Sequence, residues 1–220
     1  MPEKEYNSED LCQIMQLIVA SCDGATAHLM AKNGIHYKKN YGVALPQLVK
    51  IASLVPQNDA LAAALWQHDV REHKIVALML CTAHFPEQMA AEWQQNLPTQ
   101  EIAELMGMKL LPRMPYAVSL SVRMLASNNT LARLSAMHTL IRCIDRLHLS
   151  DVPNVAQQVL EHLQSEQLND CCVAGMLLGR LAATYPDCSD TIDQMTVSAA
   201  TKGGYATQLP LFFQSETTIK

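Results

Sequence analysis

Apolar residues recur along this chain at the three- and four-residue spacing of an amphipathic α-helix. The first run follows Ser8 and predicts a helix over residues 8–21. Its apolar positions are Leu11, Ile14, Met15, Ile18 and Val19. A shorter helix is expected over 25–32, because Asn33 and Gly34 form a helix-stop signal. Runs rich in strand-favouring residues are scarce, so the pattern indicates an all-α protein.

The middle of the chain continues this pattern after a loop from Ile35 to Gly42. Pro46 lies near the start of a helix whose apolar face includes Leu48 and Ile51. Beyond Pro56, short turns, many of them marked by proline, separate a series of helical segments. These are expected at residues 58–67, 70–83, 86–96, 99–111, 115–127, 130–147, 153–165, 168–184 and 187–200.

Antiparallel helix pairs that recur about every 30–40 residues are typical of an α-solenoid. We therefore interpret residues 1–202 as one HEAT-like helical repeat domain, a superhelical array of antiparallel helix pairs of HEAT-like or armadillo type. A compact helical bundle is the alternative. Residues 203–220 are expected to form an irregular C-terminal tail. It either packs Leu211 to Phe213 against the last helices or is partly disordered.

Composition fits one sizeable core, with 49% hydrophobic and 17% charged residues in a chain of 220. Residues 1–10 are polar, and no apolar run reaches the roughly 18–20 residues that span a bilayer. We expect a cytoplasmic protein that does not enter a membrane. Seven cysteines, an odd number, favour reduced thiols over disulfides. No CxxC occurs and the eight histidines lack metal-ligand spacing, so neither a metal nor another cofactor is expected.

Charge is unevenly distributed. The net charge of −5 argues mildly against a nucleic-acid partner. However, two windows contain no acidic residue, from Gly24 to Asn58 and from Leu105 to Ile144. Their basic residues are Lys32, Lys38, Lys39 and Lys50 in the first window, and Lys109, Arg113, Arg123, Arg133 and Arg142 in the second. Either the two windows form one basic face, or these side chains cap helix ends and solvate outer surfaces.

Two segments carry a family resemblance. The first is NYGVALPQL (residues 40–48), and the second is LWQHDVREHKIVALML (residues 65–80). They resemble the bacterial AlkD-type DNA alkylation repair family, which has a YGVxxPxL element and an LWxxxxRExK/RI motif. Residues 92–111, EWQQNLPTQEIAELMGMKLL, match a further segment of that family. The resemblance covers residues 28–147 well. One departure is Val49, where the family often has arginine.

The resemblance implies a solenoid of HEAT-like repeats whose concave face holds duplex DNA. The family removes cationic alkylated purines, which are already good leaving groups. Such an enzyme mainly stabilises the developing oxocarbenium sugar and positions water. An aromatic face supplies negative π density, a carboxylate stabilises the cation and orients water, and an arginine holds a phosphate.

Carried over by position, the catalytic tryptophan of the family falls on Gln100 and its catalytic aspartate on Glu104. The four-residue spacing keeps both side chains on one helix face. However, an amide has no π face, and Glu104 extends about an ångström further than aspartate, a displacement that can cost about 100-fold in rate. Arg133 is the candidate for the catalytic arginine, although a structural arginine is common near this point of HEAT-like repeats.

The resemblance also implies contacts to DNA. Lys38, Lys39 and Tyr41 lie in the loop before Gly42, and Lys109 and Arg113 follow the candidate catalytic positions. Such side chains contact phosphates and position a protein without reading base sequence. The alternative is a hydrated basic loop without a ligand.

We therefore expect a DNA-repair-type protein, a monomer, that binds duplex DNA on a basic concave face and whose excision of alkylated purines is weakened or lost. The alternative, from another class, is a HEAT-repeat scaffold that binds protein partners and has no glycosylase activity. The net charge of −5 fits that role.

Overall fold

The computed structural model describes residues 6–163 and 166–217, and within them every regular element is helical. The first helices are α1 (Ser8–Ala20), α2 (Gly24–Lys32), α3 (Leu45–Ala52), α4 (Asp59–Trp66), α5 (Arg71–Leu80), α6 (Glu87–Gln95) and α7 (Gln100–Leu105). A π-helical turn, η1 (Met106–Leu110), continues α7. The remaining helices are α8 (Ala117–Leu125), α9 (Thr130–Arg142), α10 (Val152–Glu161), α11 (Leu168–Thr184), α12 (Pro186–Ala200) and α13 (Leu209–Thr217).

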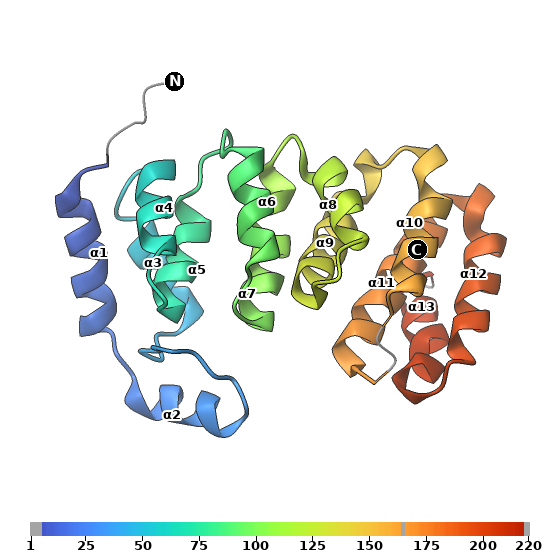
Figure 1. Cartoon of the computed structure of the whole chain (residues 1–220), viewed down its shortest axis with the longest axis horizontal. Coiled ribbons are helices and arrows are strands. Elements are labelled where there is room, and N and C mark those ends of the chain that lie inside the picture. Colours follow the sequence, from blue (N-terminus) through green and yellow to red (C-terminus); the bar gives the residue numbers. More distant parts are fainter. Residues whose placement is uncertain (1–5, 164–165, 218–220) are drawn as a thin grey trace.

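The helices stack along one axis in two rows, with α1 at one end and α12 and α13 at the other (Figure 1). In one row α3 packs against α5, α7 contacts α5 and α9, and α11 lies between α9 and α13. In the other row α10 contacts both α8 and α12. The expected α-solenoid of HEAT-like helix pairs is confirmed. No single described helix is long and apolar enough to cross a bilayer. The helices α1 and α2 reach that length and composition only when taken together, and they are bent by 78° relative to each other.

Side-chain caps fix where many helices begin, because they accept hydrogen bonds from the free backbone amides of the first turn. Asn58 Oδ1 accepts from the Leu61 amide at 2.9 Å, and Thr99 Oγ1 accepts from the Ile102 amide at 3.4 Å. Asn7, Asp23 and Asn129 act in the same way. Each such cap contributes about 1 kcal/mol. At these five helices the polar caps explain why the starts expected from sequence lie within two residues of the observed ones.

The loop of residues 33–44 is held by the first turn of α5. Glu72 is fully buried, and its carboxylate accepts hydrogen bonds from the backbone amides of Tyr41 (3.1 Å) and Val43 (3.2 Å). Between these two residues Gly42 has φ +72°, and a Cβ there would lie 2.1 Å from the Asp23 carbonyl oxygen. Only glycine fits this position.

Arg71 connects the same loop to α7. Its Nη1 donates to the Val43 carbonyl oxygen at 2.9 Å. Its Nε and Nη2 donate to the two carboxylate oxygens of Glu101, at 2.8 and 2.6 Å. Tyr37 also donates to Glu101 from within the loop. The Arg71–Glu72 pair of the family motif is therefore a structural clamp between three segments.

An aromatic stack forms the core beneath this clamp. The rings of Trp66 and Trp93 are parallel, with centroids 4.1 Å apart, and Phe85 packs against Trp93 at 4.8 Å. All three are buried. Trp93 is a packing residue, because its indole is enclosed between α4 and the segment before α6.

Two of the expected helices end at least five residues earlier than predicted. The helix expected over 99–111 changes into the π-helical turn η1 after Leu105. Gly107 lies in this turn, where a Cβ would be 2.3 Å from the Ser135 carbonyl oxygen and 2.8 Å from His138 Cβ. The helix expected over 130–147 ends at Arg142. It ends there because Arg146 turns away to donate to the carbonyl oxygens of Pro112, Met114 and Pro115.

The tail expected to be irregular is helical in its described part. A 3-10 turn over Gly204–Gln208 leads into α13, which packs against α11. Leu209 and Phe213 are buried, whereas Leu211 is exposed. Gly175 makes this packing possible, since a Cβ on it would lie 2.5 Å from Phe212 Cβ. Residues 218–220 of the predicted tail lie outside the described residues.

Replacing Glu101 tests the clamp through its pH dependence. Burial would raise the pKa of Glu101, but the hydrogen bonds from Arg71 and Tyr37 outweigh burial and hold this pKa below its ordinary value. A lowered carboxyl pKa stabilises the fold above the unfolded pKa, and this stabilisation is lost as the pH falls through the folded pKa. We expect Glu101→Gln to lower the free energy of unfolding by about 3 kcal/mol at pH 7. In urea titrations this deficit should shrink toward pH 3, and a deficit independent of pH would contradict the interpretation.

Replacing Gly107 tests the close approach of η1 and α9. Gly107→Ala places a methyl group against the Ser135 carbonyl, which is backbone and cannot rotate away. We expect a loss of about 2–3 kcal/mol in the free energy of unfolding, measured by urea denaturation. Gly24→Ala is the matched control, because nothing lies within 4 Å of a Cβ at that position. Equal stability of the two variants would show that η1 does not require glycine.

Candidate nucleic-acid interface

Gln100 and Glu104, predicted from the resemblance, lie one turn apart on α7 and contact each other. Gln100 Nε2 donates to Glu104 Oε1 at 2.8 Å. Asn169 Nδ2, from the first turn of α11, approaches the same oxygen at 3.5 Å. Gln100 is exposed and Glu104 is half-buried. The site is thus a carboxylate held by two amides, with no aromatic ring at the position where the family has tryptophan.

Arg133, the third predicted catalytic residue, is not brought to this carboxylate. Its side chain is 6% exposed. The guanidinium donates to the Ser127 carbonyl oxygen at 2.7 Å and to Thr130 Oγ1 at 3.3 Å. Within the described ranges it makes no hydrogen bond or ion pair with Glu104. These contacts fasten the turn between α8 and α9, which is what a structural arginine of a helical repeat does.

His138 is a neighbour of Glu104 that the sequence did not single out. Its Nε2 atom is buried and has no hydrogen-bond partner among the described residues. Burial lowers the pKa of His138 despite the attraction of the Glu104 carboxylate, and the positive charge of Arg142 lowers it further. The imidazole is therefore neutral near pH 7. No sequence signal could reveal this, because it depends on the approach of α9 to η1.

The lysines of the first acid-free window are exposed. Lys38 and Lys39 lie in the clamped loop, and Lys39 Nζ is 4.8 Å from the centre of the Tyr41 ring, a cation–π distance. In the described part of the chain, neither ammonium group forms an ion pair. The structure brings Lys38, Lys39 and Tyr41 together around one pocket of about 470 Å³.

Most arginines of the second window serve the fold instead. Arg113 Nη2 donates to the carbonyl oxygens of Leu78 and Cys81, both at 3.2 Å, and so caps the end of α5. Arg123 pairs with Glu87. Lys109 and Arg142 remain exposed, and no hydrogen bond or ion pair engages them in the described residues. The alternative that basic side chains cap helix ends therefore holds for Arg113.

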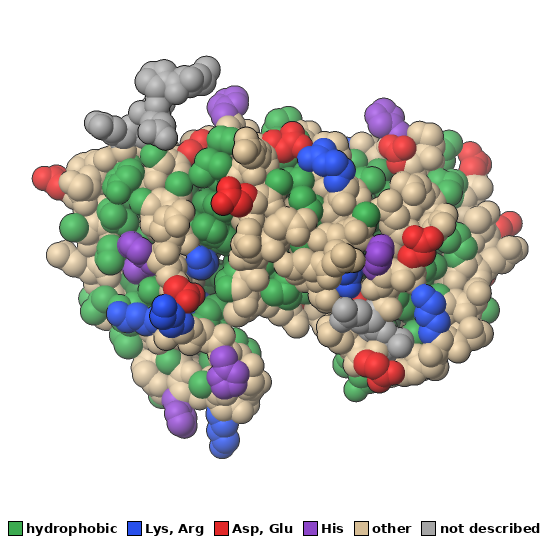
Figure 2. All heavy atoms as spheres, viewed as in Figure 1, with side chains coloured by type: hydrophobic (Ala, Val, Ile, Leu, Met, Phe, Trp, Pro, Cys, Tyr) green, Lys and Arg blue, Asp and Glu red, His purple; other side chains and the backbone are tan. Residues whose placement is uncertain are grey.

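Basic and acidic side chains are mixed on the face that Figure 2 shows, which is not uniformly basic. Lysine and arginine side chains are scattered there among acidic ones, and the lower edge is hollowed between the lobe that contains α2 and the C-terminal end (Figure 2). No group of three or more histidine, cysteine, aspartate or glutamate residues suited to a metal occurs in the described residues.

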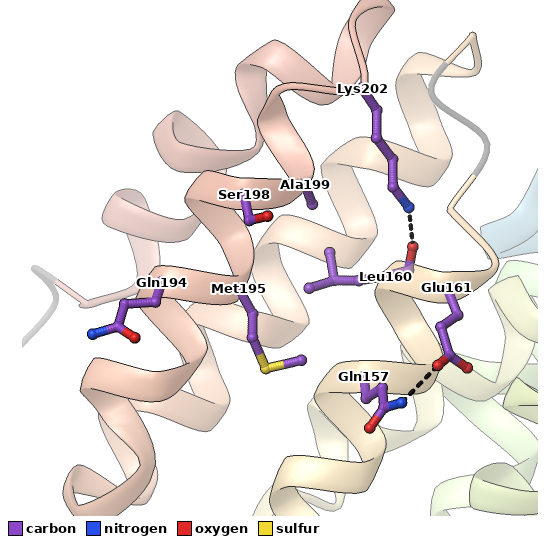
Figure 3. Close-up of a pocket in the computed structure, with 8 residues that line it drawn as sticks. All are labelled: Gln157, Leu160, Glu161, Gln194, Met195, Ser198, Ala199 and Lys202. Carbon is purple, nitrogen blue, oxygen red and sulfur yellow. Dashed lines mark hydrogen bonds between the residues drawn. The ribbon is translucent and has the colours of Figure 1, made fainter.

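A second pocket, of about 400 Å³, lies between α10 and α12 (Figure 3). Its two charged side chains, Lys202 and Glu161, are already engaged. Lys202 Nζ donates to the Leu160 carbonyl oxygen at 2.6 Å, and Gln157 Nε2 donates to Glu161 Oε1 at 2.6 Å. This arrangement caps α10 and offers little to a charged ligand.

Comparison with known proteins agrees with this architecture. One solved structure aligns with a TM-score of 0.71 at 16% sequence identity, covering 86% of this chain and 83% of the other. That protein is described as one of "a new family of proteins related to the HEAT-like repeat DNA glycosylases with affinity for branched DNA structures". A search of curated sequences gives no match. A family model described as "DNA alkylation repair enzyme" matches residues 14–166, more than half of the sequence, and the chain therefore belongs to the DNA alkylation repair enzyme family.

Proposed function

We propose that this protein binds double-stranded DNA through its phosphates and has little or no capacity to excise alkylated purines. The observation that carries the proposal is the Gln100–Glu104 hydrogen bond of 2.8 Å at the position of the family's catalytic pair. An amide donates to the carboxylate where an aromatic ring would otherwise face the sugar. This exchange removes the π density that stabilises an oxocarbenium ion, and it occupies an oxygen of the carboxylate.

Two further contacts support the loss of excision. The amide of Asn169 crowds the same oxygen of Glu104. The guanidinium of Arg133 is committed to the Ser127 carbonyl and is therefore not available to a phosphate. Each contact weakens one of the three functions that the chemistry requires, which are cation stabilisation, water orientation and phosphate clamping.

DNA binding is supported by cations that the fold does not use. Lys38, Lys39 and Lys109 are exposed, and among the described residues none of them is in an ion pair. Such side chains release counterions when they meet phosphates, and this favours binding without base specificity. The structural relative is described as having affinity for branched DNA. We extend that preference to this chain as part of the proposal.

A protein-binding scaffold is the second candidate, and one observation favours it. The N-terminal helices expose large apolar side chains to solvent, which is common at protein interfaces. These side chains are Val19, Leu29, Val49 and Leu54. Binding to a protein through them would depend weakly on salt, whereas binding to DNA through phosphates depends on it steeply.

A glycosylase assay with Gln100→Trp tests the loss of excision. On duplex DNA that contains a cationic alkylpurine, we expect the wild-type chain to release base at least about 100-fold more slowly than an active glycosylase of the family assayed in parallel. Gln100→Trp should raise the rate about 10-fold or more, because it restores a π face and removes the Gln100 amide from Glu104 Oε1.

Gln100→Leu is the matched control for this assay. It also removes the amide donor from Glu104 Oε1 but supplies no π density, so it should not restore excision. Rapid release by the wild-type chain would contradict the proposal. Equal activity of the Trp and Leu variants would show that the aromatic face is not the missing component.

Salt dependence tests the phosphate contacts. We expect the logarithm of the binding constant for duplex DNA to fall linearly with the logarithm of salt concentration, and Lys109→Ala to reduce the slope by about 1. Arg123→Ala removes the same charge from a side chain that already pairs with Glu87, and it should leave the slope nearly unchanged. Fluorescence anisotropy measures both variants. A wild-type slope near zero would favour the scaffold instead.

A further inference from the structure

A pocket opens between α1, the clamped loop and the turn from α4 to α5. Its volume is about 470 Å³, enough for a small ligand. Its lining residues are Met15, Lys38, Lys39, Tyr41, His68, Asp69, Val70 and His73. Gln100 and Glu104 are not among them, so the pocket is separate from the position of the family's catalytic pair.

The lining favours an anion. Lys38 and Lys39 are exposed, while Asp69 is the one acidic side chain among the lining residues. The first turn of α5 also reaches the pocket, with Val70 as its N-cap residue and no side-chain cap on its amides. The Arg71 amide already donates to the Lys39 carbonyl oxygen, so this helix start adds partial positive charge to the wall of the pocket rather than a free first donor.

A histidine pair forms part of the same wall. His68 Nδ1 and His73 Nδ1 are 2.9 Å apart, so one nitrogen donates and the other accepts. His73 is only 3% exposed, and burial lowers its pKa to about 4, with the positive charge of His68 acting in the same direction. His73, being neutral, can donate from its Nδ1 to His68 Nδ1, so that the N–H of the His68 ring is at Nε2. This contact fixes the His68 ring and leaves its Nε2 for a ligand.

The recessed shape of the pocket distinguishes a phosphate at the end of a DNA strand from a phosphate within the strand. A phosphodiester within a duplex is flanked by sugars on both sides and lies along a continuous ridge. A terminal phosphate protrudes and can enter a recess. It also carries close to two negative charges at pH 7, because the second pKa of a phosphomonoester is about 6. The two ammonium groups of Lys38 and Lys39 match that charge better than the single charge of a phosphodiester.

We propose that this pocket binds the terminal phosphate of a DNA strand, a phosphomonoester at the end of a branch or flap. The inference rests on the proposed DNA binding and adds the chemical group that the N-terminal part of the solenoid recognises. Lys38 and Lys39 are the charged contacts, His68 is a third donor, and His73 positions His68.

The test compares branched DNAs that differ only in a terminal phosphate. A flap duplex is prepared with a 5′-phosphate, a 3′-phosphate or only hydroxyls on the flap, and its affinity is measured by fluorescence anisotropy at constant salt. We expect one of the phosphorylated flaps to bind about 10-fold more tightly than the hydroxyl flap. The arm that gains affinity identifies which end is recognised.

Variants of the lining residues test whether the gain in affinity for a phosphorylated flap comes from this pocket. Lys38→Ala combined with Lys39→Ala should remove the 10-fold difference, and His68→Ala should reduce it. The backbone carbonyl of Lys39, which accepts from the Arg71 amide, is retained in these variants, so the loop stays clamped. Lys50→Ala is the matched control, because Lys50 is an exposed lysine of the same acid-free window that does not line the pocket. It should keep the full difference.

The outcomes separate this inference from the proposed function. If wild-type protein binds all three flaps equally, and the lysine variant weakens all three equally, the pocket contacts internal phosphates; the inference is then overturned while DNA binding stands. If the protein binds no DNA, the proposed function fails. In that case the imidazole NMR signals of His68 and His73 are followed with a phosphorylated and an unphosphorylated trinucleotide. Shifts caused only by the phosphorylated form support the pocket, and no shift refutes it.

Discussion

The contact of the Arg71 guanidinium with Glu101, Val43 and Glu72 is the constraint on which the N-terminal half of this solenoid depends. Arg71 is almost fully buried, so its charge has lost most of its hydration and requires partners of good geometry. The two Glu101 oxygens and the Val43 carbonyl supply them, and Glu72 holds the adjacent amides. Because these acceptors come from the loop and from α7, one side chain fixes both the lysine loop and the helix that carries Gln100.

Other basic side chains also have their charge satisfied by acceptors within the fold, and this decides how much positive charge remains for a ligand. Arg113, Arg146 and Lys202 each donate to carbonyl oxygens at a turn or a helix end. Stacked short helices leave many such carbonyls unpaired, and long basic side chains satisfy them well. An acid-free stretch of sequence is therefore a poor measure of a basic surface in this fold. In the first window the lysines remain outside such contacts, and this makes the loop the stronger place for a phosphate.

Sequence predicted the helices and the repeat architecture well, because a 3.6-residue period, polar caps and prolines act locally. It failed where two distant segments meet. The π-helical turn depends on Gly107 against Ser135, and α13 depends on Gly175 against Phe212. The sequence pattern around each glycine does not indicate which distant residue the glycine will contact. For the site, spacing correctly placed Gln100 beside Glu104, but the burial of Arg133 and the position of His138 follow from how α9 packs, which no local signal contains.

The residues that carry the family resemblance are not those on which the proposed loss of excision depends. The two sets differ in how deeply they are buried. The residues that carry the resemblance, such as Trp66, Arg71 and Glu72, are buried, so most replacements would destabilise the fold. Gln100 is exposed, and its only hydrogen bond among the described residues is to Glu104 on the same helix. An exposed position of this kind can change with little cost in stability. In the proposed function, the scaffold of an alkylation repair enzyme persists while residue 100 loses its part in excision, a change that the family match over residues 14–166 does not detect.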